Sequence, residues 1–223
     1  MPFINLTSKL KSKILWLSLI YLPLFGLLAA IKIQNKIAVS VLFTDIFVLA
    51  NVPVYTGLIS NFGIFLWAAT GIICFFTYVL LLNQNNPQRK VNQFIFYGGV
   101  LSFLLMVDDG FLLHERIFPN YLQLPQEITV AVYGIFVILF LLKFRKIVVN
   151  SDFTFLSLAI LFFGCSILVD FLVPENYKGS LSLLIEDGNK LLGIASWATY
   201  FISFSFKRVE NELMRTIDLE KGE

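Results

Sequence analysis

The fold is decided by residues 57–82, which read GLISNFGIFLWAATGIICFFTYVLLL and contain no charged side chain. The hydrocarbon core of a bilayer is about 30 Å thick, so a helix needs about 20 apolar residues to cross it. This stretch reaches that length, and its apolar residues lack the alternation typical of barrel strands. Because only helices and closed barrels satisfy their backbone in lipid, the stretch predicts a membrane-spanning helix.

The composition of the whole chain leads to the same prediction. Of its 223 residues, 57% are apolar and only 14% are charged, whereas soluble domains carry about 25% charged residues. The sequence therefore predicts an all-α polytopic membrane bundle with six spanning helices, in a single domain over residues 1–208. The predicted spans cover about residues 14–31, 57–82, 94–116, 126–144, 153–173 and 181–206.

Two segments fall outside these spans. Residues 36–56 carry Asp45 and Pro53, so we expect a short helix that is capped by Thr44 or Asp45 and lies at the membrane interface. If this segment crossed the membrane, the number of spans would rise to seven. Residues 209–223 mix both signs of charge and are expected to form a helical or disordered cytoplasmic tail.

Positive charges gather on one side of the predicted bundle. Short loops rich in Lys and Arg stay in the cytoplasm, so their distribution orients the chain. Loops on the amino-terminal side hold Lys9, Lys11, Lys13, Arg89, Lys90, Lys143, Arg145, Lys146, Lys207 and Arg208, whereas the other side holds chiefly Lys32, Lys36, Arg116 and Lys178. Both termini are therefore predicted to be cytoplasmic, in a multi-pass protein of the cell (inner) membrane.

The charge of the chain limits its possible partners, and the positions of its cysteines argue against a disulfide. The net charge of +2 is spread over several short loops and forms no patch suited to nucleic acid. The predicted partner is therefore the lipid bilayer. Cys74 and Cys165 lie in the middle of apolar runs, where a small buried thiol is expected rather than a disulfide.

Ionisable residues near the spans gather at the predicted extracytoplasmic end. A charge exposed to lipid costs at least about 2.5 kcal/mol on insertion scales, so these side chains are expected to turn inward towards one another. The sequence thus predicts a polar site that opens to the extracytoplasmic side. Its candidate residues are Asp108, Asp109, His114 and Glu115 in the third span, Asp170 in the fifth, and Glu186, Asp187 and Lys190 in the sixth.

A divalent metal is one hypothesis for this site. Asp108 and Glu115 are seven residues apart, which places them on one face of a continuous helix, and His114 lies beside Glu115. Imidazole and carboxylate groups both suit Zn, Mn and Fe ions. His114, Glu115 and Asp108 are therefore the candidate metal ligands.

Lys190 leads to two further hypotheses. Glu186 and Asp187 precede it by four and three residues, so either these acids or Asp108 and Asp109 across the bundle are expected to neutralise it. Such an ion-pair cluster would fix the register of the helices without any chemistry. A chain of carboxylates with one histidine is also typical of proton or cation relays.

Three segments resemble a group of uncharacterised bacterial multi-pass membrane proteins. They are residues 108–115 (DDGFLLHE), 186–193 (EDGNKLLG) and 53–67, which begins with PVYTG. This resemblance covers most of the spanning part and implies no activity. A fainter resemblance is to the alkaline ceramidase and progestin-receptor-like membrane hydrolases, which gather acids and histidines at one side of a bundle. It implies a zinc-dependent hydrolase, although this chain lacks their three histidines and their seventh span.

Three functions follow from these patterns. The first is a metal-dependent membrane hydrolase acting on a lipid-like substrate, with Asp187 or Glu186 completing the ligand shell. The second is a proton- or cation-coupled transporter or channel, in which the acids form the ion path and Lys190 is a fixed counter-charge. The third is a membrane assembly protein that has no chemistry of its own.

Overall fold

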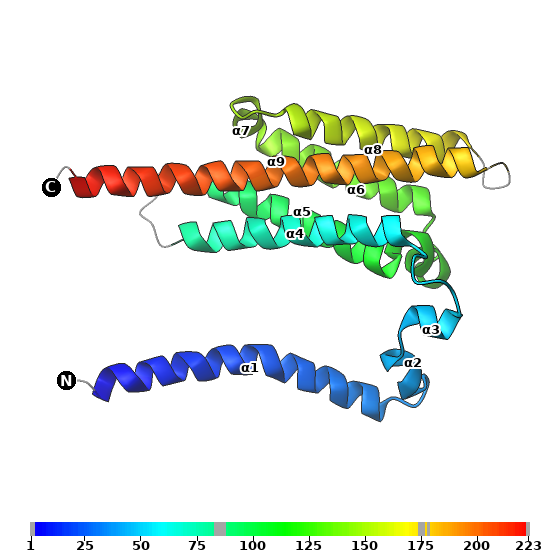
Figure 1. The fold of residues 1–223 in the computed structure, drawn as a ribbon, viewed down its shortest axis with the longest axis horizontal. Coiled ribbons are helices and arrows are strands. Elements are labelled where there is room, and N and C mark those ends of the chain that lie inside the picture. The colour runs from blue at the N-terminus through cyan, green and yellow to red at the C-terminus, as the bar shows by residue number, and fades with distance from the viewer. Residues whose placement is uncertain (1–2, 83–87, 174–176, 178, 222–223) are drawn as a thin grey trace. The chain divides into compact units, whose positions relative to one another are not determined.

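The long apolar runs of the sequence form helices (Figure 1). The computed structural model describes residues 3–82, 88–173, 177 and 179–221, and every regular element among them is a helix. The all-α prediction is therefore confirmed for the described residues. Lys178, which the sequence analysis places on the side opposite the amino terminus, lies outside them.

Contacts divide the chain into two units, with the boundary between Thr56 and Gly57. The first unit contains α1 (Phe3–Ile33), α2 (Val39–Phe43) and α3 (Ile46–Ala50). α1 continues through Pro23, and its ribbon bends near the middle (Figure 1). Its apolar part, Leu17–Ile33, lies at the lower limit of the length that spans a bilayer.

Two very short helices occupy the segment that was expected at the membrane interface. The carboxylate of Asp45 accepts a hydrogen bond of 2.8 Å from the backbone N–H of Phe47 and so caps α3, as expected for one of the two candidate caps. Asn51 ends this helix with φ +50°. Each helix has only five residues, far below the length that a crossing needs.

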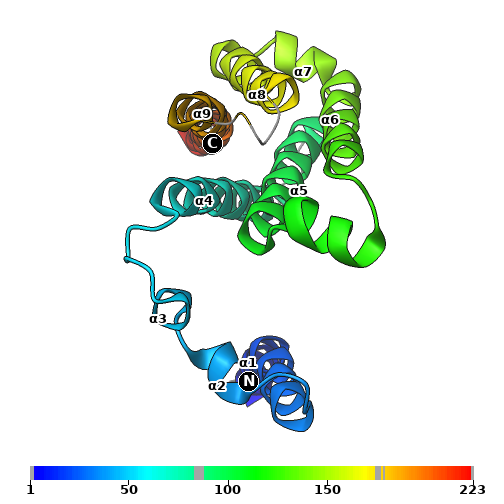
Figure 2. The same ribbon diagram turned by 90° about the vertical axis from the view of Figure 1, so that its right-hand side faces the viewer.

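The second unit is a helical bundle. α9 packs against both α8 and α4, and α4 packs against α5, as the end-on view in Figure 2 shows. The π-helix η1 contacts α5 and α6. The elements in chain order are α4 (Leu58–Leu81), α5 (Arg89–Phe111), η1 (Leu113–Leu122), α6 (Gln126–Lys143), α7 (Arg145–Val149), α8 (Thr154–Leu172) and α9 (Ser180–Lys221).

Four of the described helices are long and apolar enough to cross a membrane: α4, α5, α6 and α8. They correspond to the second to fifth predicted spans, so the structure supports four of the six. α9 is not among them. Its uncharged stretch is short, because Lys190 precedes it and Lys207 follows it. α9 also continues to Lys221, so residues 209–221, expected as a tail, prolong this helix.

Aromatic rings and a glycine form the centre of the bundle. Phe94 stacks on Phe140 with ring centroids 5.2 Å apart, and Trp197 lies 4.8 Å from Phe201. A Cβ atom at Gly98 would lie only 2.2 Å from the Phe201 ring. The absence of a side chain at Gly98 therefore leaves room on α5 for the Phe201 ring of α9.

The outward surface of the second unit is apolar. Large side chains such as Phe65, Phe76 and Leu168 are more than half exposed. An apolar surface of this kind is compatible with a membrane protein. Cys74 and Cys165 are free thiols, and Cys74 is fully buried, as expected from their positions in apolar runs.

Candidate functional site

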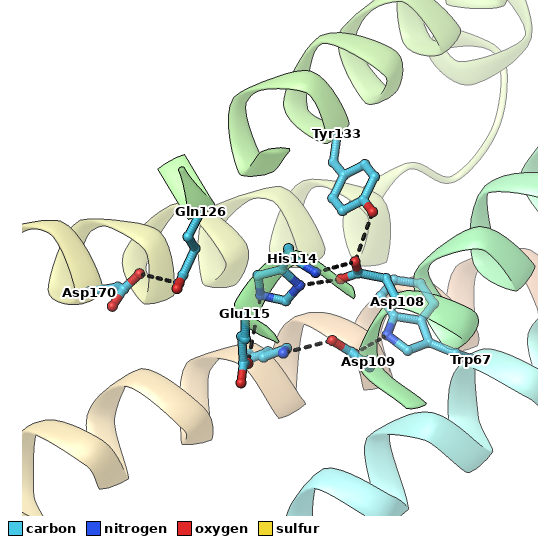
Figure 3. Close-up of polar contacts among 9 residues, drawn as sticks. Trp67, Asp108, Asp109, His114, Glu115, Gln126, Tyr133 and Asp170 are labelled. Carbon is cyan, nitrogen blue, oxygen red and sulfur yellow. Dashed lines mark hydrogen bonds and ion pairs between the residues drawn. The ribbon is translucent and has the colours of Figure 1, made fainter. Parts of the chain in front are cut away.

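The site is built where α5 ends. α5 stops at Phe111 because Leu112 takes the left-handed conformation, with φ +52°, and its N–H bonds to the carbonyl of Asp108. The chain then turns into η1, which brings His114 back against Asp108 (Figure 3). The sequence prediction of one helix that continues to Arg116, with Asp108 and Glu115 on a common face, is therefore corrected by this turn.

Asp108 is the most buried acid of the site, with 2% of its surface exposed. Its Oδ1 accepts hydrogen bonds from the backbone N–H of His114 at 3.1 Å and from the Tyr133 hydroxyl at 2.8 Å. Its Oδ2 contacts Nδ1 of His114. The carboxylate is thus held by η1 and α6 together. Tyr133 is a single tyrosine in an apolar run, so no sequence pattern indicates this role.

Asp109 contacts a different pair of helices from Asp108, and it joins α4 to α9. Its Oδ2 accepts a hydrogen bond of 3.1 Å from the Trp67 indole N–H, and its Oδ1 accepts one of 2.8 Å from Lys190 Nζ. Asp109 is one of the four acids considered as partners of Lys190, and the two form an ion pair. Asp108 and Asp109 therefore connect four elements of the bundle through their side chains.

His114 lies between a buried acid and an exposed one. Its Nδ1 faces Asp108, and its Nε2 lies 3.6 Å from Oε1 of Glu115. Side-chain exposure rises from 3% at Asp108 through 12% at His114 to 42% at Glu115. Burial alone would lower the pKa of His114, but the hydrogen bond and negative charge of Asp108 outweigh it and hold this pKa above its usual 6.5.

The other predicted residues lie around this group rather than within it. Asp170 of α8 accepts a hydrogen bond of 3.4 Å from Gln126, a separate pair in Figure 3. Glu186 is half-buried and Asp187 is exposed, both on the turn of α9 that precedes Lys190. Ion pairs join Asp108 to His114, His114 to Glu115 and Asp109 to Lys190, and these five of the eight candidates form the group.

Three potential metal ligands lie together in this group. Donor atoms of Asp108, Asp109 and His114 all fall within 4.8 Å of one another. However, Lys190 already pairs with Asp109, and Nδ1 of His114 already faces Asp108. A metal ion bound by these three residues would therefore have to displace a lysine ammonium group and a proton. Glu115, a predicted ligand, is not among the three.

Comparison with known proteins places the chain in an uncharacterised family. A family described as a domain of unknown function, DUF8692, matches residues 16–204. The chain belongs to this family. The match includes every residue of the polar site. No curated protein and no solved structure matches the chain, so the activity of this DUF8692 member has to be inferred from its own side chains.

The geometry of this DUF8692 member suits proton transfer. A carboxylate that accepts the Nδ1–H of a histidine fixes the tautomer in which Nε2 carries a lone pair. Here Asp108 also accepts the backbone N–H of His114, so the ring is held by two contacts to one side chain. Nε2 is thereby directed away from Asp108 towards Glu115, at the more exposed edge of the group.

Proposed function

We propose that this protein crosses the membrane six times, through α1, α4, α5, α6, α8 and α9. The apolar outer surface of the bundle supports this placement. The charges near the start of α9 are compatible with it, because Lys190 pairs with Asp109 inside the bundle instead of facing lipid. α1 is long enough to cross, since it has 31 residues.

Both termini lie in the cytoplasm in this proposal. The supporting feature is the excess of Lys and Arg at the amino-terminal ends of α1 and α5 and at the carboxyl-terminal end of α6. α5 begins at Arg89 on that side and ends at Phe111 on the other. The polar group around Asp108 then opens to the extracytoplasmic side of the cell membrane.

The function that this site supports best is hydrolysis of a lipid-like substrate. The observation that carries it is the hold of buried Asp108 on His114, which leaves Nε2 as the proton acceptor. A histidine held in this way takes a proton from water as the water attacks an ester or amide carbon. It then returns that proton to the leaving group, while the Asp108 carboxylate stabilises the transient imidazolium.

A divalent metal would change how the attacking water is activated. The ion would be held by Asp108, Asp109 and His114, and it would lower the pKa of a bound water. Because Lys190 and the Nδ1 proton occupy these ligands, the geometry favours the histidine as base over the metal. Elemental analysis of the purified protein separates these two forms of the proposal.

The experiment compares wild-type protein with His114→Asn and with Glu127→Gln in nanodiscs. Asparagine keeps a donor for Asp108 but lacks Nε2, and Glu127 is an exposed acid at the first turn of α6 that serves as a control. Metal content and hydrolysis of fluorogenic lipid-like esters and amides are measured. We expect hydrolysis to be lost in His114→Asn alone. A folded wild type that hydrolyses no member of the panel would overturn the proposal.

A second candidate function, a proton relay, is favoured by a different observation. Tyr133, Asp108, His114 and Glu115 form a chain of contacts, along which exposure increases from Asp108 through His114 to Glu115. Such a chain conducts protons between the interior of a bundle and its surface. Proton flux into liposomes that falls in Asp108→Asn, without hydrolysis in the wild type, would support it. If both assays are silent and the variants change only stability, the group is a structural cluster in an assembly protein.

A further inference from the structure

A second polar region lies at the other end of the second unit. Lys207 is 17 positions beyond Lys190 on α9, which corresponds to about 25 Å along the helix axis. A cavity of about 720 Å³ opens there between the start of α5, α7, the start of α8 and the second half of α9. Its volume lies within the range of small-molecule binding sites.

Cations predominate in the wall of this cavity. Lys146 of α7 and Lys207 and Arg208 of α9 line it, together with one carboxylate, that of Asp152. Lys146 and Lys207 are exposed, so their ammonium groups can move to meet a ligand. Among the described residues that line it, positive charge exceeds negative charge by two, which favours an anion.

Arg208 is the most informative of these residues. Its side chain is 94% removed from solvent, since only 6% is exposed, and Nη1 donates to Glu212 at 2.8 Å. Its Nε and Nη2 are also buried, and neither has a hydrogen-bond partner within the part of the chain that the structure describes. Arg215 approaches the other oxygen of Glu212 at 3.5 Å, so Glu212 is shared between two cations. Buried donors of a charged group are normally satisfied, which indicates a missing acceptor.

Neutral groups complete a lining that suits a phosphate ester. The hydroxyls of Ser151 and Tyr200 face each other at 2.9 Å, and both residues line the cavity. Phe155 and Phe204 supply apolar wall beside them. A phosphate group offers several acceptor oxygens to guanidinium and ammonium donors, while the apolar wall suits the organic part of an ester.

We propose that this cavity binds a phosphate group, which Arg208 holds together with Lys146 and Lys207. The phosphate belongs to an anionic lipid headgroup or to a soluble phosphate compound. These residues lie at the ends of predicted spans, where basic side chains meet the headgroups of the cytoplasmic leaflet. The site is independent of Asp108 and His114, so its failure would leave the proposed hydrolase unaffected.

The test measures binding in maltoside detergent that contains no phosphate. Inorganic phosphate, short-chain phosphatidylglycerol and the matching diacylglycerol without phosphate are titrated, and the unfolding temperature and the bound mass are followed. The variants are Lys207→Gln and Lys146→Gln, with Arg145→Gln as the control, because Arg145 is a neighbouring exposed cation that does not line the cavity. A fourth variant, Arg208→Gln, is added if it folds.

We expect each lysine variant to weaken binding of a phosphate-bearing ligand by about tenfold, and Arg145→Gln to leave it unchanged. Binding of phosphatidylglycerol but not of inorganic phosphate identifies a lipid headgroup, and binding of inorganic phosphate alone identifies a soluble ligand. The proposal is overturned if the wild type binds neither of them. It is equally overturned if diacylglycerol binds as well as phosphatidylglycerol, or if Arg145→Gln weakens binding as much as Lys207→Gln.

Discussion

The charged side chains at the two ends of the bundle differ in how completely they are paired. At the end of α5, Asp108 and Asp109 are each bonded by donors from neighbouring elements, and Lys190 has its counter-ion inside the protein. At the other end, Arg208 is also buried, but two of its guanidinium nitrogens, Nε and Nη2, have no hydrogen-bond partner among the described residues. The first group is therefore organised before any ligand arrives, whereas in our proposal a phosphate group completes the second.

The largest effect on stability is expected from replacing Asp108. In Asp108→Ala, His114 and Tyr133 lose their common acceptor in a site that is almost fully buried. Breaking such a buried network is expected to lower the free energy of unfolding by about 3–5 kcal/mol. Reversible unfolding in mixed micelles measures this value. The exposed neighbour variant Asp187→Asn should change it by less than about 0.5 kcal/mol, and equal effects of the two would show that the network is not organised as described.

The packing that joins the two ends is tested at Gly98. A methyl group placed there meets the Phe201 ring, so Gly98→Ala is expected to destabilise the protein by about 1–3 kcal/mol. Gly134→Ala is the matched control, since nothing lies within 4 Å of its new Cβ. The same unfolding measurement applies. A neutral Gly98→Ala would mean that the Phe201 ring does not lie against Gly98 as the structure has it.

The protonation of His114 gives a third test, because it links the stability of the Asp108 group to pH. Because Asp108 raises the pKa of His114 above 6.5, protonated His114 stabilises the folded state fully below that pH. This contribution should disappear as the pH rises through the folded-state pKa. Unfolding of metal-free, EDTA-treated protein between pH 5 and pH 9 should therefore show a loss of stability at the alkaline end. His114→Asn should remove that loss, and an unchanged pH profile in this variant would rule out His114 as its source.

The smallest effect is expected at the cavity. Without a phosphate ligand, Lys207→Gln removes an exposed charge that shares the cavity wall with two other cations, Lys146 and Arg208, and with the Asp152 carboxylate. The free energy of unfolding should stay within about 0.5 kcal/mol of the wild type. A large destabilisation of the phosphate-free protein would mean that Lys207 is part of an internal network, as Lys190 is, and would remove the contrast between the two ends.

The sequence predicts much of the fold because apolar runs leave few alternatives in lipid. α4, α6 and α8 begin and end within one residue of the predicted spans, since charged or polar residues flank each run. The end of α5 is different. Leu112 is an ordinary apolar residue, and its positive φ has no signature in composition, so the turn that creates the site was not predicted. The nearest glycine in the sequence is Gly110, two residues before this turn.

The sequence predicts the charged residues of the site but not the neutral side chains that bond to them. A charge facing lipid is costly, so acids and Lys190 are expected to pair inside the bundle. The charged residues near the spans could therefore be grouped from the sequence. Trp67 and Tyr133 each bring one polar atom on a largely apolar ring, and such residues are common in spans for packing alone. Their roles as donors to Asp109 and Asp108 depend on how helices distant in sequence are placed side by side.

The most direct test of the proposed hydrolase separates its chemistry from its fold. Hydrolysis of the fluorogenic panel and the unfolding temperature are measured on the same nanodisc preparations of wild type and His114→Asn. We predict a folded variant whose hydrolysis is slower by about 10²- to 10⁴-fold, because Nε2 is lost while a donor to Asp108 remains. Equal hydrolysis by the two proteins would contradict the assignment of His114 as the base.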